Sequence, residues 1–346
     1  MILLREIQEK DLDAIEKLAQ VPGMFNLVSD RDGLKDKIRW SLASFRDEIK
    51  NRSECKYVFV AEDLEKRQVL GTSMIAAQHG TVEAPHFYFE IGSEEKFSET
   101  INTGFIHGTL KLKYDTNGPS EIGALVMDPA HRGSEQRVGR QISFVRFLFL
   151  GMNKARFKKK ILAELLPPLN KKGQSPLWEA VGRRFTNMDY WEADQLCNKN
   201  KEFIFSLFPT GKIYTTFLPA EARNAIGKVG KETEPVLHML QKIGFKYKNQ
   251  VDPFDGGPHL WAGVDELGPV KKLSTFTLAS GLEAAGSPPD SGLVCRAEQK
   301  SGEFRAVAAQ VVIKDGRLAL HGSQAKTAAG TLGLQAGESV VFMPYY

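Results

Sequence analysis

The chain has 346 residues, of which 42% are hydrophobic and 25% are charged, as in ordinary globular proteins. Its net charge of +4 is small and spread along the sequence. This argues against a nucleic-acid-binding protein, which usually concentrates its basic residues on one face. The three cysteines are odd in number and far apart, so we expect no disulfide framework and a cytoplasmic protein. No apolar run is long enough to span a membrane, and charges at residues 5 and 6 argue against a signal peptide.

The first part of the chain predicts strands and helices in a layered order. Residues 2–7 read as a strand, Asp11 to Gln20 as a helix capped by Asp11, and Asp30 to Lys50 as a second helix. Residues 57–62 and 69–77 read as the two strands of a hairpin. This order indicates an α/β or α+β layer fold.

The stretch Glu121–Ser143 carries the clearest functional signal. Its apolar run from Ile122 to Met127 predicts a buried strand, which Asp128-Pro129 ends because proline cannot continue a strand ladder. A loop rich in Arg and Gly follows, and apolar residues then recur at helical spacing. Strand, basic glycine loop and helix N-terminus in succession predict a phosphate site, because free N–H groups and the helix dipole both face the anion.

The second part of the chain predicts one further domain boundary. We expect residues 1–268 to form one α+β domain, a mixed sheet flanked by helices, with 166–230 as an insertion within it. Residues 269–291, rich in small residues and proline towards their end, are expected to be a linker. Alternating strands in residues 292–346 predict a small β-barrel or sandwich.

Separated blocks of the chain resemble the arginine N-succinyltransferase family. They occur in the family's order and cover nearly the whole chain: SPLWEAVGRRF (175–185), DYWEAD (189–194), IYTTFLP (213–219), AIGKV (225–229), VDPFDGGP (251–258) and LGLQAGESV (332–340). The stretch 121–143 also resembles the acyl-CoA-binding motif of the GCN5-related N-acyltransferases. The resemblance implies that fold, and transfer of succinyl from succinyl-CoA to the α-amine of L-arginine.

The resemblance also implies partners and cofactors. Succinyl-CoA would be the acyl-donor co-substrate, with no tightly bound cofactor, and the family suggests a homodimer or a two-subunit assembly. We expect no nucleic-acid partner and no membrane. Candidate cofactor-binding residues are the strand end and the basic loop: Leu125, Val126, Met127, Arg132, Gly133, Arg137, Gly139 and Arg140. Guanidinium groups suit a pyrophosphate because they form paired, charge-assisted bonds, although one of these arginines is expected to be a surface charge.

One departure from the family concerns the proton donor. The family has a histidine after the AIGKV-like block, whereas this chain has Gly230, which cannot transfer a proton. His238, about two helical turns later, is the candidate acid or base, and a packed or surface histidine is the competing interpretation. His107 and His259 are weaker candidates. Pro253 also replaces the family's isoleucine and removes a backbone donor.

Carboxylates are needed to bind the guanidinium of an arginine substrate. Glu164 at a strand end and Asp255 in the DGGP turn are the candidates, although Asp255 has an equal claim to shape its turn. The spacing of His, Cys and Glu residues predicts no metal site.

Gly230 leaves three hypotheses open. The first is an arginine N-succinyltransferase. The second is a related acyl-CoA N-acyltransferase with a changed amine substrate or proton donor. The third is a catalytically impaired chain that binds acyl-CoA or serves as a partner subunit.

Overall fold

The computed structural model describes residues 1–21, 30–197, 200–280 and 289–346. The chain is a mixed α/β protein with two compact units. Unit 1 comprises residues 1–77, 120–159 and 263–346, and unit 2 comprises residues 78–119 and 160–262. Among the described residues, no helix is long and apolar enough to cross a membrane.

Unit 1 contains an antiparallel sheet in the order β1-β2-β3-β6. Its strands are β1 (Ile2–Glu6), β2 (Lys56–Asp63), β3 (Gln68–Ala76) and β6 (Ser120–Met127). All four lie where the sequence predicted strands. Because side chains alternate along a strand, β2 supplies both faces of the sheet with apolar residues.

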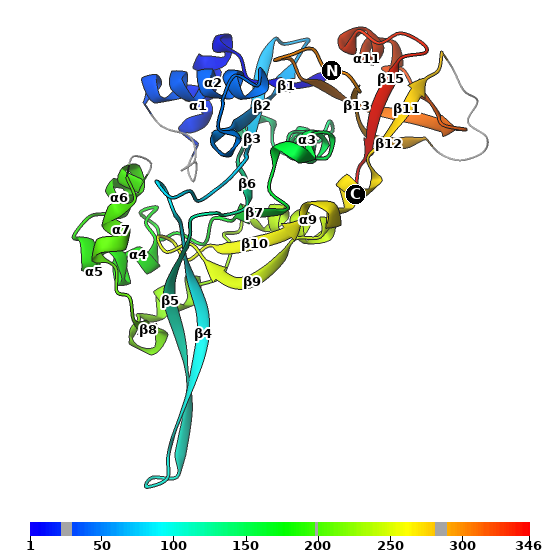
Figure 1. Ribbon diagram of the computed structural model, residues 1–346. Coiled ribbons are helices and arrows are strands. Elements are labelled where there is room, and N and C mark those ends of the chain that lie inside the picture. The colour runs from blue at the N-terminus through cyan, green and yellow to red at the C-terminus, as the bar shows by residue number, and fades with distance from the viewer. Residues whose placement is uncertain (22–29, 198–199, 281–288) are drawn as a thin grey trace. The chain divides into compact units, whose positions relative to one another are not determined.

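Helices cover both faces of this sheet. Val58 and Val60 of β2 pack with apolar residues of α1 (Leu12–Ala19) and α2 (Arg31–Phe45). On the other face, Tyr57 and Phe59 contact Phe149 of α3 (Val138–Met152). The sheet therefore forms the middle of a three-layer arrangement (Figure 1).

Two predictions about the helix ends were wrong. Helix α2 ends at Phe45 rather than Lys50, because Asp47 adopts a left-handed conformation with φ of 58° that cannot continue a helix. Asp11 does not cap α1 with its side chain. Its carboxylate instead accepts hydrogen bonds from Arg5 at 2.7 and 2.8 Å and from the N–H of Gln8 at 2.8 Å.

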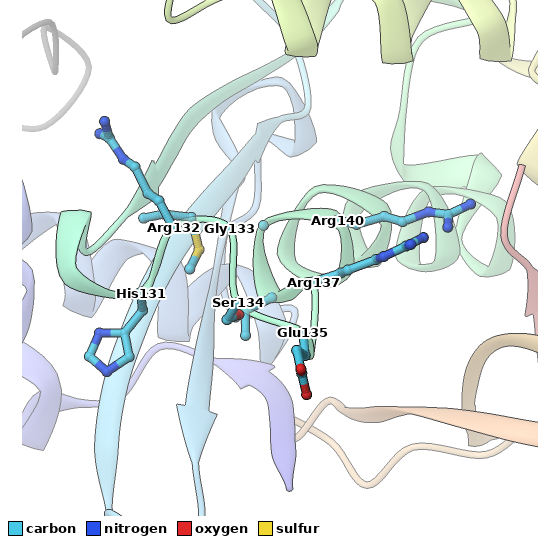
Figure 2. A pocket seen from close by; sticks show the side chains of 10 residues that line it. His131, Arg132, Gly133, Ser134, Glu135, Arg137 and Arg140 are labelled. Atoms are coloured by element: carbon cyan, nitrogen blue, oxygen red, sulfur yellow. The ribbon is translucent and has the colours of Figure 1, made fainter.

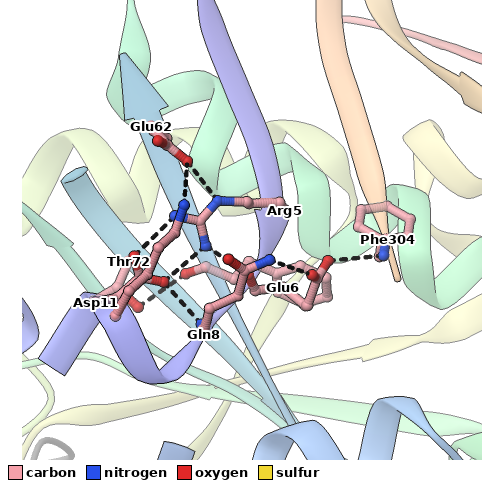
Figure 3. A network of polar contacts seen from close by, with 9 residues as sticks. Arg5, Glu6, Gln8, Asp11, Glu62, Thr72 and Phe304 are labelled. Atoms are coloured by element: carbon pink, nitrogen blue, oxygen red, sulfur yellow. Dashed lines mark hydrogen bonds and ion pairs between the residues drawn. The ribbon is translucent and has the colours of Figure 1, made fainter. Parts of the chain in front are cut away.

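Arg5 is the centre of a buried polar network, which we call the Arg5 network (Figure 3). Besides its two bonds to Asp11, its Nε donates to Glu62 at 2.6 Å and its Nη1 to the carbonyl of Glu6 at 2.9 Å. The carboxylate of Glu6 accepts from the N–H of Phe304 at 2.8 Å. These bonds tie β1 to β2, to the 3₁₀ turn Glu9–Asp11 and to the residue preceding β13.

Five described strands near the C-terminus close into a barrel in the cyclic order β11-β15-β12-β13-β14. Their bounds are β11 Ser274–Leu278, β12 Asp290–Arg296, β13 Arg305–Lys314, β14 Arg317–His321 and β15 Ser339–Pro344. Apolar residues of these strands and of α11 (Ala325–Leu332) form its core, including Val294, Val307 and Leu332. Strand β11 and helix α10 (Gly268–Lys272) fall within or at the edge of the expected linker, and residues 281–288 of that linker lie outside the described residues.

Unit 2 contains a sheet that includes the order β10-β9-β4-β5-β8. The bounds of its strands are β4 His86–Ser98, β5 Thr103–Asp115, β7 Lys160–Glu164, β8 Lys212–Tyr214, β9 Lys246–Val251 and β10 Pro258–Gly263. Strands β4 and β5 form a long two-stranded arm (Figure 1).

The helices of unit 2 come mainly from the expected insertion. Their bounds are α4 Pro176–Ala180, α5 Gly182–Thr186, α6 Tyr190–Cys197, α7 Glu202–Leu207, α8 Ala220–Ala225 and α9 Glu234–Ile243. Helix α9 has Pro235 in its first turn, where proline is tolerated, and ends at Gly244, which has φ of 118°.

Candidate functional site

Strand β6 carries a bulge just before the predicted cofactor residues. Its pairing with β3 passes from Met74 opposite Gly123 to Thr72 opposite Val126. Ala124 and Leu125 therefore face a single residue of β3, and Ala124 adopts a left-handed φ of 48°. A bulge of this kind interrupts the regular ladder and redirects the strand. The regular strand therefore ends in a reshaped segment at the predicted site.

A pocket of about 560 Å³ lies at the end of this strand. It is formed by Met127, His131, Arg132, Gly133, Ser134, Glu135, Arg137, Val138, Gly139 and Arg140. The pocket thus contains six of the predicted cofactor residues, while Leu125 and Val126 do not line it. Its size lies within the range of ligand pockets.

Backbone N–H groups at the start of α3 suit an anion. Within the described residues, no backbone acceptor pairs with the N–H groups of Gly133, Ser134, Val138 or Gly139. The first N–H groups of a helix have no partner inside the helix, and the helix dipole adds positive potential there. The loop therefore has the donors that a phosphate requires.

The three loop arginines differ in direction. Figure 2 shows the side chains of Arg137 and Arg140 extending to the same side of the loop, while that of Arg132 points the other way. Arg140 also donates to the main-chain oxygen of Tyr346 at 2.8 Å and lies over the ring of Tyr345. Burial lowers the pKa of Arg140, an effect that Tyr345 opposes and the neighbouring charge of Arg137 strengthens. Two guanidinium groups on the same side of the loop favour an anion between them.

Unit 2 brings together four residues that we call the histidine cluster: His79, His86, Glu164 and His259. The distance from Nε2 to Oε1 of Glu164 is 3.7 Å for His79, 3.5 Å for His86 and 3.4 Å for His259. The rings of His86 and His259 are stacked with centroids 5.2 Å apart, and those of His79 and His86 are 4.6 Å apart. Glu164, a predicted substrate residue, is therefore enclosed by imidazoles.

The two histidines on strands are deeply buried. His86 is 1% exposed and His259 is 0% exposed. Burial lowers the pKa of His259 well below its usual value, and His86 and His79 add to this effect, so its neutral form is favoured at pH 7.

A group of carboxyls adjoins the cluster. Burial raises the pKa of Asp252 to about 7, and Glu164 adds to the shift, while N–H groups of Phe254 and Asp255 oppose it. Burial followed by Asp252 raises the pKa of Asp255 well above its usual value. Burial and Asp252 also raise the pKa of Asp194 to about 7. Asp255 accepts a 2.7 Å hydrogen bond from the N–H of Gly257, so it shapes its turn whatever else it binds.

Gly230 and His238 occupy different surroundings. The N–H of Gly230 donates to the carbonyl of Leu166 at 3.0 Å, so Gly230 lies beside the segment that follows Glu164. His238 is exposed on α9. Within the described part of the chain, no hydrogen bond or ion pair fixes its ring. The structure therefore does not bring His238 into the histidine cluster.

Sequence reasoning missed His79 and His86 and ranked His259 low. The cluster combines residues 79, 86, 164 and 259, so no short spacing in the sequence reveals it. His107, the other weak candidate, lies outside the cluster and is within 3.1 Å of the hydroxyl of Thr216.

Comparison with known proteins assigns the chain to a family. Residues 2–268 match the family model described as "Arginine N-succinyltransferase beta subunit". The chain belongs to the arginine N-succinyltransferase family. It is 34% identical over 292 residues to an arginine N-succinyltransferase of Citrobacter koseri, covering 84% of each chain. It is 33% identical over 327 residues to one of Escherichia coli O139:H28, covering 94% of this chain and 93% of that protein.

A solved structure supports the same assignment. The arginine/ornithine succinyltransferase subunit AI from Pseudomonas aeruginosa matches with a TM-score of 0.83 and 27% identity, covering 100% of this chain and 99% of that one. The predicted α+β fold with a small C-terminal β-barrel is thus confirmed. The chain belongs to a family of acyltransferases, and the general expectation of an acyl-CoA co-substrate is supported.

Proposed function

We propose that the chain transfers succinyl from succinyl-CoA to the α-amino group of L-arginine. The supporting observation is the pocket at residues 127–140 of this family member, where the side chains of Arg137 and Arg140 extend to the same side beside the N-terminus of α3. Arg137 and Arg140 would bind the pyrophosphate, with the N–H groups of Val138 and Gly139. Backbone groups of Leu125, Val126 and Met127 would hold the pantetheine arm.

The amine substrate would use the carboxyls of unit 2. After burial, the charge of Asp252 helps to raise the pKa of both Asp194 and Asp255, and Glu164 helps to raise that of Asp252. A guanidinium would relieve that repulsion and restore their charged forms. Glu164 and Asp255 remain our candidates for direct contact. Aminolysis also needs a neutral amine and a proton for the leaving thiolate, and His238 is the candidate acid.

The test is CoA release from succinyl-CoA with L-arginine, with L-ornithine and with no amine. We expect arginine-dependent release, and a general acid contributes about 10²–10⁴-fold to the rate. His238→Ala should then lower kcat by that order while CoA binding is unchanged. Arginine-dependent release that survives His238→Ala would remove His238 from the mechanism and leave the reaction in place.

Gly230 favours a second candidate function. A chain without the family's histidine could act on another amine or bind acyl-CoA without transfer. In that case, CoA binds but no release depends on arginine. Gly230→His separates the two possibilities, because a Cβ at this position lies 3.3 Å from the carbonyl oxygen of Pro167, and small shifts of the neighbouring backbone admit the side chain. Gain of arginine-dependent release in this variant would identify an impaired transferase.

We further propose that the chain assembles with a second copy through the arm β4–β5. Four apolar side chains near the end of the arm are 61–74% exposed: Phe97, Ile101, Phe105 and Ile106. A two-stranded ribbon is marginally stable by itself, and exposed apolar patches mark interaction sites. Light scattering should report a dimer that Ile106→Asp converts to a monomer. A wild-type monomer, or a complex only with a different chain, would contradict this assembly.

A further inference from the structure

The two residues that follow β15 lie beside helix α3, whose first turn borders the pocket of residues 127–140. Strand β15 ends at Pro344, and the N–H of the next residue, Tyr345, donates to the carbonyl of Ser291 in β12 at 3.0 Å. The ring of Tyr345 meets that of Phe144 in α3 at 80°, with ring centroids 5.5 Å apart. Tyr345 is therefore fixed between the barrel and α3.

Tyr346 is held by helix α10. A Cβ on Gly268, the first residue of this helix, would lie 2.4 Å from atoms of the Tyr346 ring, so the absence of a side chain there lets the ring approach. Nζ of Lys272, the last residue of the same helix, lies 4.7 Å from the centroid of that ring. The two tyrosines thus have separate anchors, and the main chain between them has a defined position.

Both tyrosines contact Arg140, one of the two arginines on the same side of the loop (Figure 2). The guanidinium carbon lies 4.4 Å from the centroid of the Tyr345 ring, and Nη2 donates to the main-chain oxygen of Tyr346 at 2.8 Å. A guanidinium at this distance from an aromatic ring is attracted by the negative charge of its face. The cation is therefore held in place without a carboxylate among the described residues.

These contacts leave most of the guanidinium available to a ligand. A guanidinium has five N–H donors, and within the described residues that of Arg140 makes one hydrogen bond, to Tyr346. Stacking occupies the face of the group, whereas an anion binds its edge. The remaining donors belong to a side chain that lines the pocket. Holding this side chain in position before the ligand arrives avoids part of the entropy that binding would otherwise cost.

Given the acyl-CoA site of the proposed function, on which this role rests, we propose that Tyr345 is a positioning residue for the phosphates of the acyl-CoA. Its ring, together with the main chain of Tyr346, holds the guanidinium of Arg140 in the orientation that receives a phosphate. The hydroxyl of Tyr345 takes no part, because it is buried and makes no hydrogen bond within the described residues. The barrel thereby contributes to cofactor binding, since β15 carries the two tyrosines.

Calorimetric titration of the full chain with CoA tests this role. Tyr345→Leu keeps an apolar side chain against Phe144 but removes the aromatic face, so the Kd for CoA should rise about threefold to thirtyfold. Tyr345→Phe keeps the ring and should bind CoA like the wild type. In an Arg140→Gln background, Tyr345→Leu should change the Kd by less than about twofold, because the ring acts through that arginine.

Three results would each overturn the role: an unchanged or lower Kd in Tyr345→Leu, the same loss of affinity in Tyr345→Phe, or an equal effect of Tyr345→Leu with and without Arg140. Circular dichroism checks that each variant is folded. If Tyr345→Leu does not fold, fluorinated phenylalanines at position 345 decide. Added fluorines weaken the negative face of the ring at nearly constant shape, so the Kd should rise stepwise with their number, and a constant Kd would refute the role.

The proposed succinyl transfer can fail separately from the role of Tyr345. A wild type that binds CoA without arginine-dependent release contradicts the transfer, and the variants still decide the role. Arginine-dependent release with equal Kd in the wild type and Tyr345→Leu contradicts only the role. A wild type that binds no CoA contradicts both.

Discussion

The Arg5 network of unit 1 and the histidine cluster of unit 2 are both buried groups of titratable side chains, but their bonding differs. The guanidinium of Arg5 reaches Asp11, Glu62 and the carbonyl of Glu6 at 2.6–2.9 Å. In the histidine cluster, the three nitrogens lie at least 3.4 Å from the carboxylate that they surround.

This difference concerns how each group compensates the burial of its polar side chains. Arg5 and Asp11 compensate each other's charge within the fold, and each is 3% exposed. His259 is buried to the same degree, and no described residue forms a hydrogen bond with its ring. Buried polar groups in folded proteins are normally paired, so the buried ring of His259 costs the fold free energy that the Arg5–Asp11 pair does not.

The largest expected effect comes from breaking the Arg5 network. Arg5→Met removes the cation and leaves Asp11 buried without its partner, which costs about 3–5 kcal/mol of unfolding free energy. Urea denaturation measures this loss as a lower midpoint at an unchanged slope.

The matched control is Arg31→Met. Arg31 also bonds two carboxylates, Asp13 at 2.6 Å and Glu16, but it is exposed. Surface ion pairs contribute about 0–1 kcal/mol, so this variant should hardly change the midpoint. Equal losses in the two variants would refute the distinction between buried and exposed pairing.

Arg146 gives a second and smaller effect of opposite sign. This side chain of α3 is 2% exposed and donates to the carbonyl and hydroxyl of Ser143, but within the described residues no carboxylate pairs with it. Burial lowers its pKa to about 9, which reflects the cost of keeping a charge there. Arg146→Met should raise the unfolding free energy by about 1–4 kcal/mol, measured by urea denaturation. A lower midpoint would show that the bonds to Ser143 outweigh the cost of the buried charge.

The fold and the loop pocket could be predicted from the sequence because their signals are local. Strand β6, the Asp128-Pro129 stop and the start of α3 follow one another within 20 or so residues, and each has its own pattern. The bulge at Ala124 was not predictable, since a left-handed alanine is imposed by pairing with β3.

The histidine cluster was not predictable because only tertiary structure creates it. His86 and His259 begin strands that are not neighbours in the sequence, and Glu164 ends a third. A single histidine carries little information by itself, and the spacing of the four residues matches no metal motif. The same reasoning explains why strand β11 went unrecognised: five residues of mixed polarity become a barrel strand only by pairing with β14 and β15.

The smallest of the three effects is a change in the affinity for CoA. It concerns Arg137, whose negatively charged partner would be a ligand. Arg137 is exposed, and within the described residues no carboxylate pairs with it, unlike Arg5. Arg137→Gln keeps a side chain with a Cβ on this backbone, whose φ is 49°, and removes the charge. A charge-assisted hydrogen bond contributes about 1.5–3 kcal/mol, so the Kd for CoA should rise roughly 10–100-fold, measured by calorimetry.

Arg132→Gln is the control, because this side chain points to the other side of the loop (Figure 2). Its loss should change the Kd for CoA less than about threefold. Added salt should weaken binding by the wild type more than by Arg137→Gln, because screening acts on the charge that the variant lacks. If both variants lose affinity equally, the phosphate is bound by the net charge of the loop and not by the paired arginines.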